Sequence, residues 1–557
     1  MFRRTRFTCA VAALGVALTM GVVSTTAQQG AARKFYSDDP LTREPETQDA
    51  SGVQEWDIDL IFDLALNLFG RPGDAMPNVR AKNVNTIDEV ADSSWFTNRI
   101  LARPLSVEEV SRGPLTGTGP APGTWTVSRP KEAGAAPGFT MQDAKGETWF
   151  VSFDAKGHPE AATGAILVAN KMFWALGYWQ VENYLIHVRP DQLVISETAT
   201  MRPPSGVRRR MRKGDLDEVL RRSHRSADGS YRAVAGKAIP GRTLGGFKYH
   251  GTRPDDPNDI VPHEHRRELR ALKVFGAWMN LVDMKAGNTL DTLITENGRG
   301  LVRHYLQDVG STFGSGANGP RAYDEGWDYL YEGGHAMKKL VLLGFPVERW
   351  RTVDYVDNEA LGRFEGTAFD ATSWKPRVPT GAFLRARADD DFWAARRVMA
   401  FSDDMIRAMV KAGQFTDPEA ERLLGDILIQ RRDRIGQAYL TAVSSLVNFA
   451  LDNSGRLTFE NAAVTAKVAN GSTTGYSATW AQFNNDTGQT TAIGSPTTPA
   501  GNQVQAPAAL PTAAGSFVKI QLSAAQPPAK GTAVAPVDVY FRRTADGWRL
   551  VGLERLP

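Results

Sequence analysis

The residues with the clearest chemical potential lie near the middle of the chain. Residues 283–288 read Asp-Met-Lys-Ala-Gly-Asn, and an Asp-Val-Gly turn follows at residues 308–310. Phosphoryl transfer needs a carboxylate that orients the attacking hydroxyl and oxygen ligands that hold a divalent metal against the phosphates. These residues supply both kinds of group. The alternative interpretation is structural: Asp283 and Asn288 cap a turn after a helix, and Asp308 is an ordinary turn residue.

The spacing resembles the catalytic loop and the metal-binding turn of protein kinases, in which Asp, Lys and Asn recur at these intervals. By that resemblance, Asp283 orients a hydroxyl acceptor and Lys285 steadies the transferred phosphate. Asn288 and Asp308 would bind Mg²⁺ or Mn²⁺, with ATP as the phosphate donor. The likeness is closest to atypical kinases of the HipA type and to the exported CotH-like kinases. It covers about residues 124–449.

The segment before this motif has the order of elements of a kinase small lobe. Short strands are predicted at residues 124–128, 138–142 and 147–153, then a helix at 159–177 and an extended stretch at 182–188. By the resemblance, the loop that holds Lys131, Gly134 and Gly138 covers the nucleotide. The glycine-rich residues 310–319 are expected to form a mobile loop at the mouth of the site.

Two positions depart from the kinase pattern. Ser152 stands where the third strand of a kinase carries its phosphate-binding lysine, and Ile166 stands where the following helix carries the partner glutamate. Lys131 or Lys156 is the candidate replacement for the lysine, and Glu160 is a candidate partner for Lys156. The resemblance therefore leaves two functions open. One is an active phosphotransferase, and the other is a non-catalytic pseudokinase scaffold that binds a cell-surface polymer or a protein partner.

The elements expected to position this motif lie on both sides of it. A helix is predicted from about residue 265 to 282, directly before Asp283, and a strand at 301–306 before Asp308. Mostly helical segments are predicted from 389 to 449. Two strands at 537–542 and 548–552, joined by an Asp-Gly turn, predict a β-hairpin near the end of the chain.

Composition and the N-terminal sequence set the broad class. The chain has 557 residues, a net charge of +3 and 42% hydrophobic residues, which does not indicate a nucleic-acid binder. Arg3, Arg4 and Arg6 precede an apolar run at residues 7–23, which predicts a signal peptide and an exported protein, periplasmic or secreted. No later stretch is long and apolar enough to predict a membrane span. The one cysteine, Cys9, falls within the signal peptide, so we expect no thiol chemistry in the processed chain.

The predicted fold is α+β, with a two-lobed protein-kinase-like core and a C-terminal all-β domain. The predicted divisions are a signal peptide (1–27), an N-terminal extension (28–123), a small lobe (124–198), a basic insertion (199–262), a helical large lobe (263–455) and the β-domain (456–557). The basic stretch at residues 208–225 is interpreted as a solvated face or as a contact for an acidic polymer.

Overall fold

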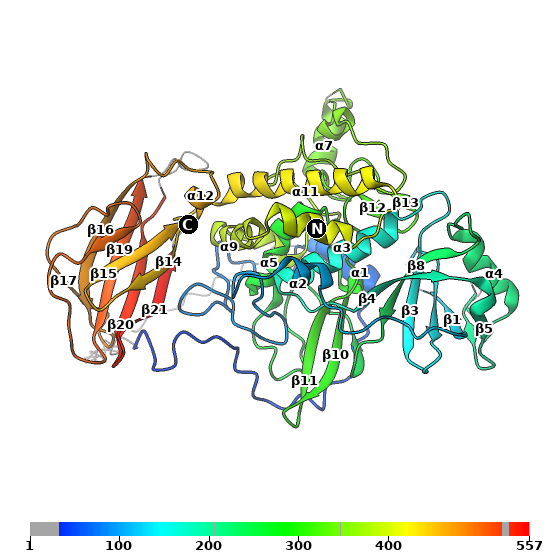
Figure 1. Cartoon of the computed structure of the whole chain (residues 1–557), viewed down its shortest axis with the longest axis horizontal. Helices are drawn as coiled ribbons and strands as arrows, with labels where there is room; N and C mark the ends of the chain where they lie inside the picture. The colour runs from blue at the N-terminus through cyan, green and yellow to red at the C-terminus, as the bar shows by residue number, and fades with distance from the viewer. Residues whose placement is uncertain (1–32, 133, 204–205, 346, 526–533, 556–557) are drawn as a thin grey trace, which may run out of the picture.

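The computed structural model describes residues 33–132, 134–203, 206–345, 347–525 and 534–555. The predicted signal peptide, residues 1–27, lies outside the described residues. Helices make up 25% and strands 24% of the chain, so the α+β prediction is confirmed. Figure 1 shows a β-rich part at each end of the long axis and a mainly helical part between them. Among the described residues, every helix is too short or too polar to cross a lipid bilayer.

A six-stranded sheet forms the part of the molecule at the right of Figure 1. Its strand order is β4-β8-β3-β2-β1-β5, and the predicted strands and helix of this region are confirmed. The elements are β1 (Trp125–Pro130), β2 (Gly138–Gln142), β3 (Thr148–Phe153), α3 (Ala161–Leu176), β4 (Asn183–Val188), β5 (Leu193–Ile195) and β8 (Tyr231–Lys237).

The two faces of this sheet differ because side chains alternate along each strand. On β3, Val151 and Phe153 are buried in an apolar cluster that also contains Leu216, Val219 and Leu220 of α4 (Lys213–Arg222). The segment between β4 and β8, which also contains β6 (Thr200–Met201) and β7 (Arg209–Arg210), therefore provides a cover for one face. The other face carries Ser152 and is approached by α3.

The middle of the molecule is built on helices that enclose the largest apolar cluster. They are α2 (Val107–Arg112), α5 (Arg267–Arg270), α6 (Leu272–Met279), α8 (Gly381–Leu384), α9 (Ala388–Met399), α10 (Asp403–Lys411) and α11 (Pro418–Tyr439). The prediction of one continuous helix over residues 265–282 is wrong. The chain forms a 3₁₀ turn at His263–His265, then α5 and α6, and it stops at Asn280, which has a left-handed φ of 55°. Asparagine tolerates that conformation better than most residues.

Two β-sheets form the C-terminal part. One contains β14 (Leu446–Leu451), β15 (Arg456–Asn461) and β18 (Gln503–Gln505); the other has the order β17 (Thr490–Ala492), β16 (Gly475–Phe483), β19 (Phe517–Ala525), β20 (Val537–Arg543), β21 (Trp548–Arg555). The predicted terminal hairpin is confirmed as β20 and β21. The predicted helical character up to residue 449 is wrong, because β14 begins at Leu446 and pairs with β15. One short helix, α12 (Ala462–Thr465), interrupts the otherwise β structure.

The N-terminal extension joins these parts (Figure 1). Phe35 packs among Phe483, Phe517 and Tyr540 of the C-terminal sheet, and the Lys34 ammonium lies 2.6 Å from the Glu554 carboxylate. The chain then runs back to the middle part, where residues 50 and 53 pack with β9 (Arg242–Gly245) and β11 (Arg299–Leu306). The extension therefore contacts both the C-terminal sheet and the middle part.

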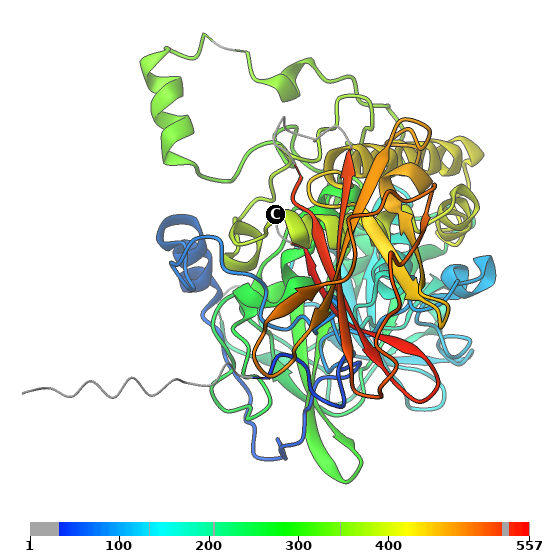
Figure 2. The same cartoon turned by 90° about the vertical axis from the view of Figure 1, so that its left-hand side faces the viewer.

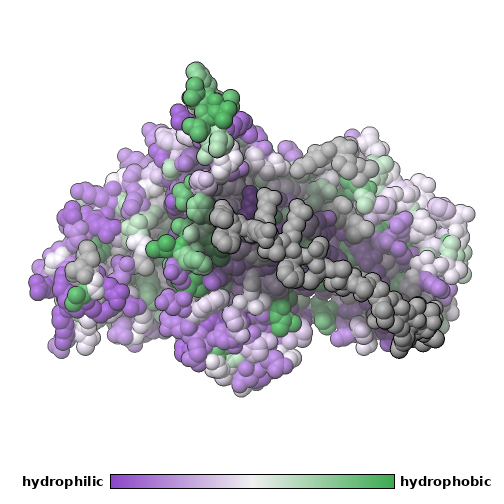
Figure 3. Space-filling view, turned by 180° about the vertical axis from the view of Figure 1, so that it is seen from behind, coloured by the Kyte–Doolittle hydropathy of each residue, from purple (hydrophilic) through white to green (hydrophobic). Residues whose placement is uncertain are grey.

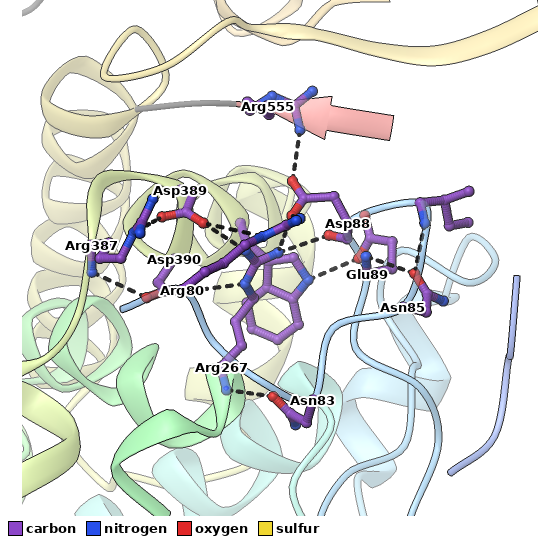
Figure 4. Close-up of polar contacts among 12 residues, drawn as sticks. Arg80, Asn83, Asn85, Asp88, Glu89, Arg267, Arg387, Asp389, Asp390 and Arg555 are labelled. Atoms are coloured by element: carbon purple, nitrogen blue, oxygen red, sulfur yellow. Dashed lines mark hydrogen bonds and ion pairs between the residues drawn. The ribbon is translucent and has the colours of Figure 1, made fainter. Parts of the chain in front are cut away.

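A buried network of charged groups makes the second connection between these parts (Figure 4). The Arg267 guanidinium of α5 is fully buried and lies 2.8 Å from Asp88, 3.0 Å from Asp389 and 2.9 Å from Asp390. The other Asp88 oxygen lies 3.1 Å from the Arg555 guanidinium at the end of β21. Asp88 thus connects the extension, the helical part and the last strand of the chain.

Replacing Arg267 with methionine is expected to destabilise the protein by about 3–5 kcal/mol, because three buried carboxylates lose their shared cation. The measurement is the urea midpoint of the loss of helical circular dichroism. Arg422→Met is the matched control. Arg422 is exposed and pairs with Glu419 and Asp426, so its loss should leave the urea midpoint almost unchanged. Equal small losses in the two variants would contradict the central role of Arg267.

Asp88 is also expected to make stability depend on pH. Burial acts to raise the pKa of the Asp88 carboxyl, but Arg267, Arg555 and Arg80 outweigh it and lower the pKa to about 2. In the unfolded chain the pKa of an aspartate is near 3.9, so above about pH 4 the ionised Asp88 stabilises the folded state. That contribution, about 2–3 kcal/mol for a shift of this size, disappears as the pH falls from about 4 to about 2.

The measurement is the urea midpoint between pH 7 and pH 3 for the wild type and Asp88→Asn. Asp88→Asn should be less stable than the wild type at pH 7, and its stability should fall less than that of the wild type on acidification. Asp486→Asn is the control, since Asp486 is an exposed carboxylate. If Asp88→Asn loses as much stability between pH 7 and pH 3 as the wild type does, Asp88 is not a source of the pH dependence.

Candidate active site around Asp283 and Asp308

The segment that carries the candidate catalytic residues leaves a rigid helix. Phe275 and Trp278 of α6 are completely buried. Asn280 ends the helix, and its amide oxygen accepts a hydrogen bond of 2.8 Å from the Trp374 indole. Residues 281–288 therefore start from a fixed point, and they end in a 3₁₀ turn at Ala286–Asn288.

A hairpin brings the metal-binding turn back to this segment. Strands β10 (Thr289–Glu296) and β11 pair in continuous antiparallel register from Thr289 opposite Leu306 to Glu296 opposite Arg299. The residues just outside the hairpin therefore meet. The Asn288 carbonyl accepts hydrogen bonds from the Gln307 and Asp308 amides, at 3.2 and 3.0 Å.

The side chain of Asn288 completes this cluster. Its amide nitrogen donates a hydrogen bond of 2.7 Å to the Asp283 carbonyl. Asp283, Asn288 and Asp308, which are separated by up to 25 positions in the chain, are thus held by backbone and side-chain bonds that all involve Asn288. The structure brings together the residues predicted for the acceptor and metal sites.

The charge of Asp283 is balanced by cations. The Lys285 ammonium lies 2.9 Å from its carboxylate, and the Arg321 guanidinium lies 3.9 Å away. Burial acts to raise the pKa of Asp283, but Lys285, the Asn288 amide and Arg321 together lower it below its ordinary value. Asp283 is therefore ionised at neutral pH and able to accept a hydrogen bond from a hydroxyl group.

The residues at the predicted metal site suit a hard cation. Since the Asn288 amide nitrogen is the atom bound to Asp283, its amide oxygen is the atom left for a ligand. Asp308 is exposed, and one of its oxygens accepts a hydrogen bond of 3.1 Å from the Gly310 amide. Amide and carboxylate oxygens are ligands that Mg²⁺ accepts, together with water and phosphate oxygens.

A second group of metal-type ligands lies elsewhere. Asp328, His335 and Glu348 place one ligand atom each within 4.8 Å of the others. The Lys339 ammonium lies 3.2 Å from the Glu348 oxygen that also faces His335, so a cation already occupies this position. This group does not add to the predicted metal site.

The position predicted for the kinase glutamate does face the metal turn. A Cβ atom on Gly310 would lie 2.8 Å from Cγ1 of Ile166, so α3 packs directly on the Asp-Val-Gly turn. The side chain at this contact is apolar and provides no carboxylate. Ser152 lies on β3 in register with Gly138 and Val234 and provides no cation.

The residues predicted to bind the nucleotide are not joined to this cluster. Lys131 is exposed and lies beside Gly134 of its own loop, where a Cβ would come within 3.7 Å of the ammonium. Gly138 starts β2, and Lys156 is exposed after β3. Within the described residues, neither lysine ammonium forms a hydrogen bond or ion pair with Asp283, Asn288 or Asp308.

Several neighbours of the site have no signal in the sequence pattern. Tyr249 is buried near Asp283, and burial together with the charges of Asp283 and Asp63 raises its pKa. In the extension, α1 (Leu60–Ala65) packs on the catalytic segment, because a Cβ on Gly287 would lie 3.1 Å from Leu60. These contacts come from distant segments, as does that of Arg321, and no motif spacing indicates them.

The basic stretch supplies one further contact to this region. The Arg222 guanidinium at the end of α4 donates a hydrogen bond of 2.7 Å to the Ala135 carbonyl, in the loop predicted to cover the nucleotide. Other arginines of the stretch are paired with carboxylates: Arg208 with Glu132, Arg209 with Asp215 and Arg221 with Glu218. These pairs favour the interpretation of a solvated face over that of a polymer contact.

The glycine-rich residues 310–319 are attached to the site by backbone bonds. The Phe313 amide donates to the Met279 carbonyl at 2.7 Å, and β12 (Ser315–Gly316) pairs with β13 (Gly319–Pro320). His158 lies directly against Gly319. The mobility of this segment stays a prediction.

The comparisons with known proteins add no assignment. No protein-family model matches this sequence, and no curated protein matches it.

A Gly310→Ala substitution should test the contact between α3 and the metal turn. The added methyl group would clash with Ile166, and overpacking of this kind costs about 1–3 kcal/mol. In an Ile166→Ala background the clash is removed, so the same substitution should cost close to nothing. The measurement is the free energy of unfolding of the two single variants and the double variant.

Gly52→Ala serves as the control, because no atom lies within 4 Å of a Cβ at that position. Additive losses at positions 166 and 310 would show that the two residues do not touch.

Proposed function

We propose that this chain is an exported, kinase-like phosphotransferase that moves a phosphoryl group from ATP, with Mg²⁺ or Mn²⁺, to a hydroxyl acceptor. The observation that carries the proposal is the convergence of Asp283, Asn288 and Asp308 through the bonds of Asn288. The surrounding organisation supports it. Helix α3, which packs on the sheet, contacts the metal turn through Ile166, and α6 leads into the catalytic segment, as expected for a two-lobed kinase-like core.

Each residue of the cluster has a role that its surroundings permit. Asp283, kept ionised by Lys285 and Arg321, accepts the hydrogen bond of the acceptor hydroxyl and orients its oxygen. Lys285 is half-exposed and carries the positive charge next to that hydroxyl, where it attracts the phosphoryl oxygens. Asn288 and Asp308 would hold the metal ion, which supplies charge neutralisation to the phosphates when bound.

A second candidate is a pseudokinase scaffold that binds a protein or a cell-surface polymer without catalysis. The observation that favours it is the apolar contact of Ile166 with Gly310, together with Ser152 on β3. In protein kinases a lysine and a glutamate from these two elements must both be in place for phosphoryl transfer. Lys131, Lys156 and Arg222 are the cations that an active enzyme would use instead.

The decisive measurement is a thermal-shift titration of the processed chain with ATP and either Mg²⁺ or Mn²⁺. We expect a metal-dependent rise in melting temperature, because a ligand at about a hundred times its Kd adds about 2.7 kcal/mol to stability. Asp308→Ala should abolish the rise. Asp217→Ala, which removes an exposed carboxylate of α4, should leave it unchanged.

Transfer of the γ-phosphate to protein or small hydroxyl acceptors should be followed with the same variants. Transfer that is lost in Asp283→Ala supports the phosphotransferase. A metal-dependent shift without transfer identifies the nucleotide-binding pseudokinase. The absence of a shift with both metals would rule out the nucleotide site, leaving the scaffold.

A further inference from the structure

One helix stands away from the rest of the molecule. Helix α7 (Gly333–Val341) continues into residues 342–345, and we call residues 333–345 the α7 arm. The arm projects at the top of Figure 1 and at the upper left of Figure 2. No residue of α7 is buried. Apart from its own backbone bonds, the helix is held by His335 and Lys339, which both contact Glu348. Its exposed apolar side chains are therefore free to contact something outside the fold.

The α7 arm is strongly apolar at its end. Exposed fractions are 68% for Leu340, 71% for Val341, 81% for Leu343 and 83% for Phe345. Figure 3 shows this tip as a compact hydrophobic area at the top of the molecule. Single exposed apolar side chains are common, but a contiguous exposed group marks an interaction site.

The charges of the α7 arm all have the same sign. Lys338 and Lys339 are exposed, and residues 333–345 contain no aspartate or glutamate. Lys339 contacts Glu348, which lies outside the arm, whereas Lys338 forms no ion pair among the described residues. Apolar residues next to lysines, without acidic residues, are the pattern of helices that lie in the interface of an anionic membrane.

A second exposed apolar element faces the same side. Helix α1 and the π-turn that follows it, Leu66–Gly70, expose Ile61, Phe62 and Phe69. The Phe69 ring lies 5.1 Å from the Tyr331 ring at the base of the arm. Figure 2 shows α1 and α7 projecting toward the same side, and Figure 3 looks onto that side.

We propose that the α7 arm docks the protein on an anionic lipid surface, with its apolar tip among the acyl chains and its lysines at the headgroups. Charge complementarity favours this occupant. Glu348 pairs with Lys339, but Lys338 forms no ion pair among the described residues, and residues 333–345 themselves carry no carboxylate. Shape favours it as well. Most of the surface of Leu340, Val341, Leu343 and Phe345 is exposed, and a bilayer can surround such a tip, whereas a flat protein face covers one side only.

Docking of this kind would also determine where the candidate active site lies relative to the lipid surface. Leu60 of α1 lies against Gly287 of the catalytic segment, and α1 is on the same side as the α7 arm. The segment that carries Asp283 would therefore lie near the lipid surface. This inference does not depend on catalysis, and it holds equally for the phosphotransferase and for the scaffold.

The test is co-sedimentation of residues 28–557 with two kinds of vesicles, pure phosphatidylcholine and an equal mixture with phosphatidylglycerol. We expect binding to the mixed vesicles that weakens with salt, and much weaker binding to the neutral ones. Leu340→Glu combined with Leu343→Glu should reduce binding at least tenfold. Lys338→Gln should reduce it about fivefold, as expected for one charge near an anionic surface.

Ile260→Glu is the matched control, because Ile260 is 77% exposed and lies outside the arm. It should bind as the wild type does. All variants should melt at the wild-type temperature, since none of the changed side chains is buried. The proposal is overturned if neither vesicle binds, or if the Leu340 and Leu343 changes leave binding intact. A third outcome also overturns it: the protein does not bind vesicles, and light scattering shows that the wild type is a dimer while the double variant is a monomer. The α7 arm would then contact a second copy of the chain.

Discussion

Buried charges can persist in a protein only while every partner stays in place, and that constraint organises this molecule. Asp88 touches Arg267 of α5 and Arg555 of the last strand, and Arg267 reaches Asp389 and Asp390 at the start of α9. Losing any one of these segments would leave charge without a partner in a dry interior. The extension, the helical part and the C-terminal sheet are therefore expected to fold as one unit, although the helical part and the C-terminal sheet each have a large apolar cluster.

The same network fixes the candidate site. Arg267 lies on α5, and α6 begins after one intervening residue. The ion network therefore holds the helical segment that leads directly into the catalytic residues. Asn280 then turns the chain, and Asn288 gathers Asp283 and Asp308. Asp308 is exposed and Asp283 and Asn288 are partly buried, while Phe275, Trp278 and Asn280, which lead into the segment, are buried. This division lets the site meet ligands without loss of geometry.

Local signals in the sequence predicted local structure well. The strands from Trp125 to Phe153, the helix α3 and the hairpin after Val537 follow from alternation, periodicity and turn residues, and all of them form. Errors arose where distant contacts decide the outcome. Residues 446–451 continue a helical region in sequence but form β14, because β15 is available to pair with them. The partners of Asp283 show the same limit. Lys285 is two residues from Asp283 and was predicted to steady the transferred phosphate, and the structure pairs it with Asp283, whereas Arg321 and Tyr249 reach Asp283 only through the tertiary fold.

The contact between Ile166 and Gly310 decides how such a site could be controlled. In protein kinases the ion pair between the third strand and the following helix can be formed or broken, and this switches the enzyme. Here α3 rests on the metal turn through an apolar side chain, and packing of that kind has no charge to gain or lose. Any regulation would then act on access to the site rather than on the position of α3. Helix α1 lies on the catalytic segment through Leu60 and on the same exposed side as the α7 arm.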